Sequence, residues 1–347
     1  MNATPDADES GQRTDAALAL HTLAEALRAS RGLAHKRDIE AVMRALRTVT
    51  PEGTMPSDAI LLGDDCAAIP DGDGYLLFAI EGFINAFVEQ QPWFAGYCGI
   101  MVNVSDIYAM GGRPIAVVDA LWSREGDAAQ PILDGLRAAS EVYGVPIVGG
   151  HSNRRTDRAQ LAVSIIGRAK HLLSSFDARP GDHLVMAIDL RGRFEDPYPN
   201  WNASVGAPSA RLRADLELLP EIAADGLALA AKDISMAGVI GTALMLLECS
   251  GVGATIDIDA IPRPADVPLL KWLSAFPSYG FLLSVRDAHL QEVIDRFARR
   301  EIACAAIGRI DDSRKVTLTM SGASTPFWNF ETDDLIGCGP GRGRRDG

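Results

Sequence analysis

The 347-residue chain lacks the long apolar runs and the cysteine pairs that mark membrane-spanning and disulfide-rich proteins. No apolar run reaches the roughly 18–20 residues that cross a bilayer. The N-terminus opens on polar and acidic residues, without the basic start and apolar core of a secretory signal. The 5 cysteines stand singly and form no CxxC pair, which argues against a disulfide framework and a structural zinc site. A soluble, cytoplasmic protein is therefore predicted.

The chain is also short of basic charge. It has 33 lysines and arginines against 46 aspartates and glutamates, and a formal net charge of −13. Binding to nucleic acid or to an anionic membrane needs a basic face, so neither partner is predicted and a small-molecule substrate is expected. The sequence contains no GxxxxGK(S/T) loop, which excludes a conventional P-loop as an ATP site. It also has no GxSxG nucleophile elbow.

What the chain does have is the composition of an ordinary globular protein and enough length for two domains. Hydrophobic residues make up 47% and charged residues 23%, close to the average for such proteins. Short apolar runs alternate with amphipathic stretches, which predicts a mixed α/β (α+β) architecture. The predicted units are a helical segment at 1–50, an α/β domain at 51–175, a second α/β domain at 176–325 and a flexible tail at 326–347.

The individual elements follow from periodicity and from turn residues. Leu20, Leu23 and Leu27 share one helical face, after a polar start at residues 1–13 that is expected to be disordered. "YLLFAIEGF" predicts a strand and residues 92–110 a buried helix. In the second domain the predicted helices lie near 209–231, 237–250, 266–276 and 287–299, and the predicted strands near 183–190, 254–258, 279–285 and 303–310. The loop at 193–210 is long for a connector, and a substrate lid and a packing loop fit it equally well.

Carboxylates occur where an apolar chain would ordinarily exclude them. Asp64 and Asp65 follow a short apolar run and a glycine, and Glu81 lies at the end of "YLLFAIEGF". Asp106 lies inside the predicted buried helix, three residues after Asn103. Burying such groups is costly unless a cation meets them. Mg²⁺ is the expected cation, because it takes carboxylate oxygens together with phosphate oxygens and water.

A second group of residues suits phosphate. Gly149 and Gly150 follow the buried run "VPIV" and would let backbone N–H groups approach a phosphate closely. His151 and Arg154 come next, and arginine makes bidentate phosphate contacts. Each feature alone also has an ordinary explanation, such as a GDD turn, a capping or ion-paired carboxylate, a strand-ending glycine pair or a merely polar histidine. Their ordered spacing is what favours the chemical interpretation.

In this order the motifs resemble those of the superfamily that contains aminoimidazole ribonucleotide (AIR) synthase, thiamine-monophosphate kinase, selenophosphate synthetase and the hydrogenase-maturation dehydratase. The chain is most similar to the AIR-synthase-related members. The resemblance runs from about residue 57 to residue 320, and "NVSDIYAMGGRP" is its most specific part. It is carried by "GDDCAAI" (63–69), "AIEGF" (79–83), "VNVSDIYAMGGRPIAV" (102–117), "VPIVGGHS" (145–152), "IIGRA" (165–169), "RPGDHLVMAIDLRG" (179–192) and "AAIGRI" (305–310).

The resemblance implies a two-domain AIR-synthase-like fold, with an N-terminal mixed-sheet domain that forms a barrel across a homodimer and a C-terminal α/β sandwich. It also implies ATP at the dimer interface, Mg²⁺ held by the acidic motifs, and transfer or release of the γ-phosphate to activate an oxygen. The implied metal ligands are Asp64, Asp65, Glu81 and Asp106. The implied nucleotide contacts are Asn103, Gly149 and Gly150, with Arg154 or Arg168 stabilising phosphate charge.

The chain departs from the family pattern at several of these positions. Glu81 stands where the family usually has Asp, and His151 occupies the Asp position of a "GGD" motif, so one metal ligand is lost there. "KDISMAGVIG" (232–241) resembles the family's "DxSDGG" segment and keeps its aspartate as Asp233. Met236 and Ala237 replace the acidic residue and the first glycine. Asp233 and His151 are predicted to make substrate-side acid–base or polar contacts.

The leading hypothesis is an ATP- and Mg²⁺-dependent phosphotransferase or ATP-driven synthetase acting on an unidentified small molecule. One alternative is a non-catalytic nucleotide-binding or assembly subunit that kept the scaffold, which the histidine of "GGH" and the segment "SMAG" motivate. A further, less favoured alternative is a metal-dependent hydrolase that uses the same carboxylates without ATP.

Overall fold

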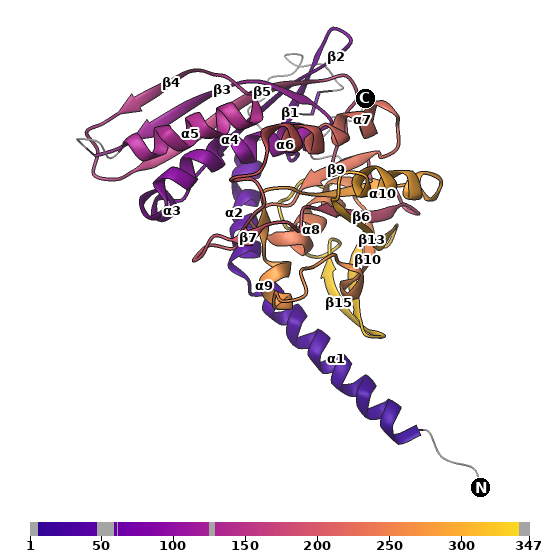
Figure 1. The fold of residues 1–347 in the computed structure, drawn as a ribbon. Helices are drawn as coiled ribbons and strands as arrows, with labels where there is room; N and C mark the ends of the chain where they lie inside the picture. The colour runs from indigo at the N-terminus through magenta and orange to yellow at the C-terminus, as the bar shows by residue number, and fades with distance from the viewer. Residues whose placement is uncertain (1–5, 47–58, 61, 125–128, 340–347) are drawn as a thin grey trace.

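The computed structural model describes residues 6–46, 59–60, 62–124 and 129–339, and arranges them as a pair of helices followed by two α/β domains (Figure 1). The first helices are α1 (Asp6–Arg28) and α2 (Arg31–Leu46). Ser30 separates them, and its hydroxyl accepts a hydrogen bond from the backbone N–H of Leu33 at 3.3 Å. The prediction of a disordered start is wrong for residues 6–13, which belong to α1; residues 1–5 lie outside the described residues.

The N-terminal domain is a five-stranded sheet with helices on one face. In spatial order its strands are β1 (Ala67–Asp71), β2 (Gly74–Gly82), β5 (Gln160–Ala169), β3 (Arg113–Trp122) and β4 (Ile147–Asn153), and only β3 and β4 run parallel. Its helices are α3 (Asn85–Gln90), α4 (Pro92–Ala109) and α5 (Gln130–Tyr143). Alternate residues of β5, namely Leu161, Val163 and Ile165, are buried, because a strand points successive side chains to opposite faces. Figure 1 shows α4 and α5 together on that covered face.

Helix α4 is apolar around its whole circumference, and its residues from Phe94 to Ala109 are all buried. Such a helix needs protein on every side, and α4 has it, because it contacts the N-terminal sheet and also α7 (Leu218–Ala224) and β9 (Ala230–Asp233) of the second domain. The helix stops abruptly at two glycines. Gly111 has a φ of +74°, which only glycine adopts without strain, and a side chain on Gly112 would collide with Leu77.

The C-terminal domain is built on a seven-stranded sheet with helices on both faces. In spatial order the strands are β15 (Ala323–Asn329), β14 (Lys315–Met320), β10 (Gly253–Asp257), β13 (Ala303–Asp311), β6 (His183–Ile188), β12 (Gly280–Val285) and β9 (Ala230–Asp233). Its helices are α6 (Ser209–Leu216), α7 (Leu218–Ala224), α8 (Gly238–Ser250), α9 (Leu269–Leu273) and α10 (Leu290–Ala298). On β6, Val185 and Ala187 join the core shared with α6, α7 and α10, whereas Leu184 and Met186 join the core shared with α8 and α9.

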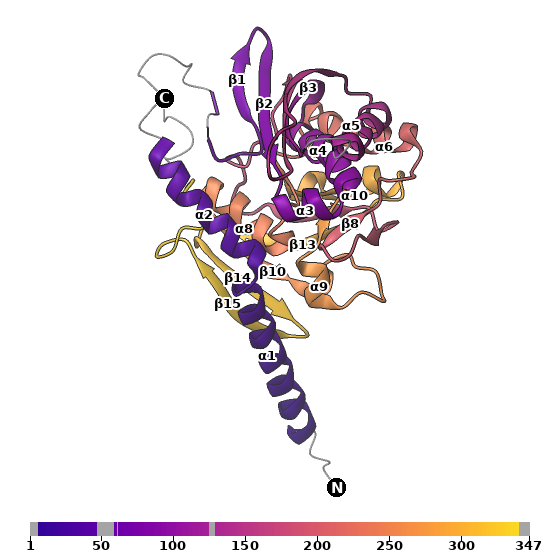
Figure 2. The same ribbon diagram turned by 90° about the vertical axis from the view of Figure 1, so that its left-hand side faces the viewer.

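The paired helices at the N-terminus pack on this second domain. Helix α1 lies along β14 and β15, and α2 runs on toward α8 (Figure 2). Leu20, Leu27 and Leu33 enter the same core as α8. Arg28 fixes the seam through its Nε, which donates to the carbonyl oxygen of Phe327 at 3.0 Å. The two-domain α/β prediction is confirmed, while the barrel across a dimer stays a prediction.

Several boundaries differ from those predicted. The helix expected at 209–231 is two short helices followed by the buried strand β9. Gly226, with a φ of +64°, ends the helical region. Within the described residues, β12 is the strand that pairs with β9. The helix expected at 266–276 shrinks to α9. The loop at 193–210 contains β7 (Arg193–Phe194) and β8 (Asn200–Asn202), which form a small sheet with β11 (Phe276–Pro277).

The predicted flexible tail is wrong for residues 326–339. Part of it is β15, and the segment 334–339 is held against α8 by the buried Glu248. The carboxylate of Glu248 accepts backbone N–H bonds from Leu335, Ile336 and Cys338 at 2.9, 2.9 and 3.0 Å. Residues 340–347 lie outside the described residues. In the part of the chain that the structure describes, no helix combines the length and the apolar character needed to cross a membrane.

Glu248→Ala is expected to lower the free energy of unfolding by about 2–3 kcal/mol, because three backbone donors lose a charged acceptor. Hydrogen exchange of residues 334–339 should rise at the same time. Urea denaturation and hydrogen-exchange mass spectrometry measure the two effects. Glu221→Ala, at an exposed position of α7, is the control. Unchanged protection of the segment in the Glu248 variant would contradict this role.

Candidate active site

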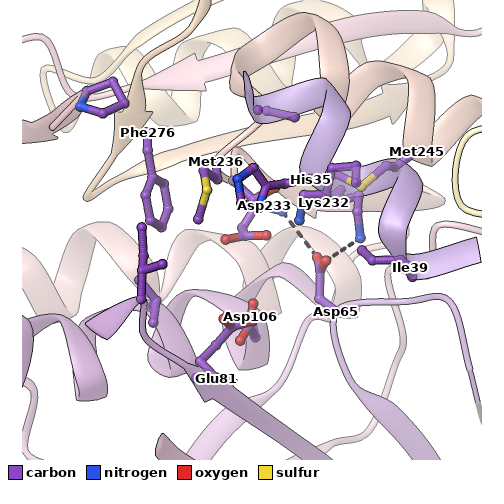
Figure 3. A pocket seen from close by; sticks show the side chains of 18 of the residues that line it. His35, Ile39, Asp65, Glu81, Asp106, Lys232, Asp233, Met236, Met245 and Phe276 are labelled. Atoms are coloured by element: carbon purple, nitrogen blue, oxygen red, sulfur yellow. Dashed lines mark hydrogen bonds and ion pairs between the residues drawn. The ribbon is translucent and has the colours of Figure 1, made fainter. Parts of the chain in front are cut away.

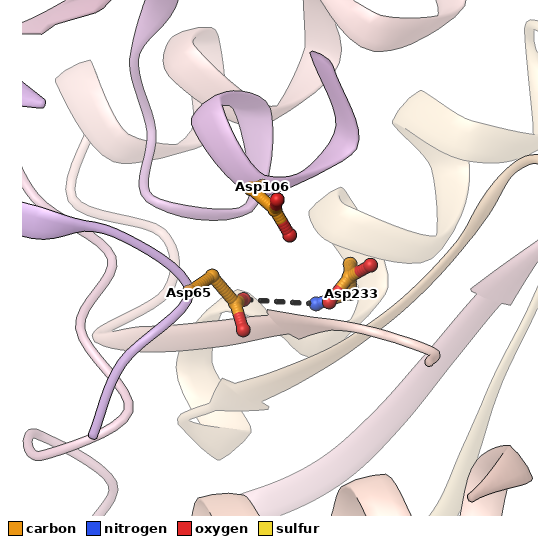
Figure 4. Close-up of side chains that lie close together, drawn as sticks. All are labelled: Asp65, Asp106 and Asp233. Atoms are coloured by element: carbon orange, nitrogen blue, oxygen red, sulfur yellow. Dashed lines mark hydrogen bonds between the residues drawn. The ribbon is translucent and has the colours of Figure 1, made fainter. Parts of the chain in front are cut away.

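Three carboxylates from distant parts of the chain converge where the two domains meet. Asp65 lies in the bend before β1, Asp106 in the last turns of α4, and Asp233 at the end of β9. One oxygen from each lies within 4.8 Å of the others. Figure 4 shows the three side chains facing one another from separate elements, with the backbone N–H of Asp233 donating to Asp65 Oδ2 at 3.2 Å.

The place of Asp106 in this cluster explains why the otherwise apolar helix α4 carries a carboxylate. Its side chain points out of the helix into the seam between the domains, and the residue is only 6% exposed. Within the described residues, its buried Oδ2 has no hydrogen-bond partner. Burial, and then the neighbouring charges of Asp233, Glu81 and Asp65, hold the pKa of Asp106 well above its ordinary value. An orphaned carboxylate oxygen in such a place fits a bound cation.

The ammonium group of Lys232 compensates part of this negative charge. Its ammonium forms an ion pair with Asp65, and both side chains are almost fully buried. Burial opposes the charge on Lys232, but Asp65 and Asp64 outweigh burial and hold the pKa of Lys232 above its ordinary value. Lys232 was not predicted as a site residue from the sequence, because residues 209–231 directly before it were predicted as helix and the strand that faces Asp65 was not expected. Its place directly before Asp233 is the feature that pointed to it.

Glu81 brings a fourth carboxylate to the same place from the end of β2, where it lines the cavity and keeps contact with solvent. Desolvation of its carboxyl group raises the pKa of Glu81, and the positive charge of Lys36 offsets part of that rise. The pKa of Asp233 is raised to about 8, first by burial and then by Asp65. Lys36 of α2 and Lys232 are the two cations that favour the ionised form of Asp233.

The donors present fit a divalent cation. With all four carboxylates ionised, as metal ligands must be, their four negative charges exceed the two positive charges of Lys36 and Lys232 by two. Oxygen donors of this kind are those that Mg²⁺ takes. Asp65, Asp106 and Asp233 are the residues that would hold it, with Glu81 close enough to act through water.

Asp64 turns away from this cluster, although it also lines the cavity. Its two oxygens accept hydrogen bonds from the hydroxyls of Ser174 and Ser175, at 2.9 and 2.6 Å, and from the backbone N–H of Ser175 at 2.9 Å. Adjacent residues in an extended bend point to opposite sides, so only Asp65 of the pair faces Asp106. Asp64 therefore ties the chain between the domains to the bend that carries Asp65.

A cavity of about 570 Å³ opens above the carboxylates, between the domains and α2. Figure 3 shows Glu81 and Asp106 on one side of it and His35 and Met245 on the other. Much of the wall is apolar. The apolar lining residues are Ile39, Met43, Phe83, Ile84, Phe87, Val102, Met236, Met245, Phe276 and Ile336. Such a mixture of apolar wall and convergent polar groups is typical of a small-molecule site.

The 193–210 loop contributes to this cavity through Tyr198, Pro199 and Asn200. Trp201, next along the chain, is buried and donates from its indole N–H to the carbonyl oxygen of Asp189 at 2.9 Å. Asn202 is buried as well, and its side-chain oxygen accepts from the backbone N–H groups of Ser204 and Val205. Some residues of the 193–210 loop thus line the cavity, and others pack in the protein interior.

The residues predicted to contact nucleotide lie elsewhere in this chain. Gly149, Gly150 and His151 are on the exposed strand β4, with Arg154 just beyond it. Arg168 pairs with Asp71 and Asp73 at the β1–β2 turn, at the other end of the sheet from Glu81. None of them is among the residues that line the cavity.

Asn103 is fully buried one helical turn before Asp106. Its amide nitrogen donates to the carbonyl oxygen of Gly99 at 2.8 Å, while its side-chain oxygen has no partner within the described residues. Asn103 does not line the cavity. Its predicted contact with nucleotide, like those of the β4 residues and the two arginines, stays a prediction.

Comparison with known proteins gives the scaffold a family context. Residues 63–169 match the family model for the AIR synthase related protein N-terminal domain, and residues 192–321 match that for the C-terminal domain. A protein of Synechocystis sp. is 48% identical over 311 residues, 88% of this chain and 94% of the relative. The selenide, water dikinase of Sulfurimonas denitrificans is 27% identical over 266 residues, 70% of this chain and 73% of the relative.

Solved structures share the fold. T. maritima PurL complexed with ATP has a TM-score of 0.64 at 19% identity, covering 84% of this chain and 47% of that one. AaThiL complexed with AMPPCP and TMP has a TM-score of 0.62 at 19% identity, covering 83% of this chain and 96% of that one. The chain thus spans about half the length of the PurL structures it matches and nearly all of the ThiL structure.

Lys232→Met is expected to lower the free energy of unfolding by about 3 kcal/mol in metal-free buffer, because it leaves Asp65 as an uncompensated buried charge. Mg²⁺ should then restore more stability to the variant than it adds to the wild type. Urea denaturation with and without Mg²⁺ measures both effects. Lys271→Met, which removes an exposed lysine on α9, is the control. Equal metal-free stability of wild type and Lys232 variant would contradict the role of this ion pair.

Proposed function

Because the chain belongs to the family of AIR synthase related proteins, we propose that it is an ATP- and Mg²⁺-dependent enzyme that transfers a phosphoryl group and so activates an oxygen of a small molecule. The single observation that carries this proposal is the convergence of Asp65, Asp106 and Asp233 at one end of the cavity between the domains. Relatives and structural neighbours support it, since their names include a selenide, water dikinase and their structures include complexes with ATP and AMPPCP.

The chemistry follows from what phosphoryl transfer requires. Catalysis of this reaction depends mainly on positioning and on neutralising charge. Mg²⁺ bound at the carboxylates would supply charge neutralisation for phosphate oxygens. Lys232 orients Asp65 through their ion pair, and the apolar wall limits the access of water to the phosphate. Asp233 is proposed here as a metal ligand, in place of the substrate-side role expected from its motif.

The alternative of a nucleotide-binding subunit without turnover has one observation in its favour. Met236, which replaces the acidic residue of the family motif, lines the cavity and brings an apolar group where the family places a carboxylate. The two functions differ in one measurable respect. The enzyme releases or transfers phosphate from ATP when its acceptor is present, whereas the binding subunit holds Mg²⁺ and ATP without either reaction.

Asp106→Asn is expected to weaken Mg²⁺ binding at least about tenfold, because it removes a charged oxygen ligand. Mg²⁺-dependent ATP binding should fall with it, while the metal-free thermal midpoint is unchanged or higher, since one of several like charges is gone. Isothermal titration calorimetry and thermal shifts with Mg²⁺ and ATP measure these effects. Phosphate release during a screen of candidate acceptors tests turnover.

Asp134→Asn, which changes an exposed carboxylate on α5, is the matched control for that experiment. Equal Mg²⁺ affinity in the wild type and the Asp106 variant would exclude the proposed metal site. Tight ATP binding without phosphate release across the acceptor screen would instead favour the binding subunit.

We further propose that the chain acts as a homodimer through the open face of its N-terminal sheet. Phe78, Ile80 and Val118 are 49%, 66% and 41% exposed. They lie on the face away from α4 and α5, since Leu77 and Val117, next to them in the strands, are buried. An apolar sheet face of this kind is a protein–protein surface, and a second copy of the chain is the proposed occupant, in keeping with the family resemblance.

Ile80→Glu is expected to convert the dimer to a monomer, because it places a charge in the centre of this face. Size-exclusion chromatography with light scattering at micromolar protein gives the mass directly. Leu133→Glu, at a 41% exposed position of α5, should leave the mass unchanged. A wild-type protein that runs as a monomer would refute the dimer.

A further inference from the structure

Helix α2 lies outside both regions that match the family models, yet it forms one wall of the cavity. Its first three turns supply Arg31, His35, Lys36 and Ile39 to the lining, and Met43 follows one turn later. Figure 3 shows His35 and Ile39 descending from α2 on the side opposite Glu81 and Asp106. The carboxylates and this helix thus face each other across the space that a ligand would occupy.

The position of α2 is fixed by close contact with the segment that departs from the family motif. A Cβ on Gly32 would lie 2.5 Å from the carbonyl oxygen of Met236 and 2.9 Å from the Cα of Ala237. Only glycine therefore permits this approach. Leu33, next along the helix, is 2% exposed and packs in the core with Ala237. The altered motif and the added helix form one packing unit, so α2 is a built part of the cavity wall.

This wall is cationic. The N-terminal end of α2, with Ser30, Arg31 and Gly32, borders the cavity, and a helix N-terminus carries partial positive charge. The half-buried Lys36 favours the ionised forms of Glu81 and Asp233. Yet among the described residues neither Arg31 nor Lys36 has a carboxylate oxygen within 4.0 Å. Arg31 donates from its Nε to Nε2 of His35 at 3.3 Å. The guanidinium of Arg31 and the ammonium of Lys36 both border the cavity without a carboxylate partner among the described residues, so both can contact an anionic ligand.

We propose that α2 recognises a phosphate group held beside the carboxylate cluster, with Lys36 as its principal contact and Arg31 as a second. Ile39, Met43 and Met245 contact the apolar part of the same ligand. A phosphate in this place has a metal–carboxylate site on one side and an ammonium group on the other, so charge complementarity selects an anion and excludes a cationic substrate. The inference rests on the proposed function, which supplies the metal beside the phosphate. The position of α2 in the cavity wall does not depend on that function.

Two sources of phosphate share this chemistry, namely the nucleotide and a phosphorylated acceptor. The test titrates inorganic phosphate, and separately AMPPCP, into the full-length protein at saturating Mg²⁺ by calorimetry. Lys36→Gln is expected to weaken phosphate binding at least about tenfold, as the loss of a charge-assisted hydrogen bond requires. Lys36→Arg should retain most of the affinity. Arg44→Gln is the matched control, because Arg44 is an exposed residue of the same helix that pairs with Glu40 and lies outside the cavity.

A parallel loss of AMPPCP affinity in Lys36→Gln identifies the phosphate as that of the nucleotide, and unchanged AMPPCP affinity identifies it as that of the acceptor. The inference is overturned if the wild type binds no phosphate, or if Lys36→Gln binds it as tightly as Arg44→Gln. It is also overturned if Lys36→Gln changes only the affinity for Mg²⁺, since Lys36 would then serve only to balance charge. Phosphate binding that depends on Lys36 but not on Mg²⁺ would remove the proposed metal function and leave the role of α2 standing.

Discussion

The structure depends on one electrostatic constraint: several carboxylates lie close together with little water around them, and like charges repel one another. Asp65, Asp106 and Asp233 belong to three elements and two domains, and they meet at the base of the cavity between the domains. Such a cluster is stable only when cations accompany it. Lys232 is the one the chain provides by direct ion pairing, and Lys36 acts from α2. The carboxylates that remain without a direct ion pair offer oxygen donors of the kind that a divalent ion takes, at the seam between the domains.

At the same seam, the adjacent and chemically identical residues Asp64 and Asp65 make different contacts. Both carboxylate oxygens of Asp64 accept hydrogen bonds from Ser174 and Ser175. These bonds fix the connection between the domains. Asp65, one residue later, faces the cavity. Gly63, whose φ is +106°, allows the bend from which the two diverge. Of the two aspartates predicted as metal ligands, one is thus bound to two serines and the other faces the carboxylate cluster.

Much of the architecture was predictable because it depends on local periodicity. The buried helix with Asp106, the strand ending at Glu81 and the alternation of strands with helices all follow from spacing. The strand β9 was not predictable, since its four residues are strand only because β12 lies beside them. The segment 334–339 was predicted as part of a tail because its partner, the buried Glu248, lies 87 to 90 residues away in sequence from the backbone groups it binds.

The sequence by itself determined which acidic residues lie in otherwise apolar segments, since a carboxylate in an apolar helix is visible without coordinates. It also determined the order of the elements, because hydrophobic periodicity is a property of neighbours along the chain. Only the tertiary structure decided which carboxylates meet, that a lysine stands among them, and that a helix outside the family domains forms the facing wall. Those facts depend on distances between residues far apart in the chain, and electrostatic energy depends on distance in space rather than on separation in sequence.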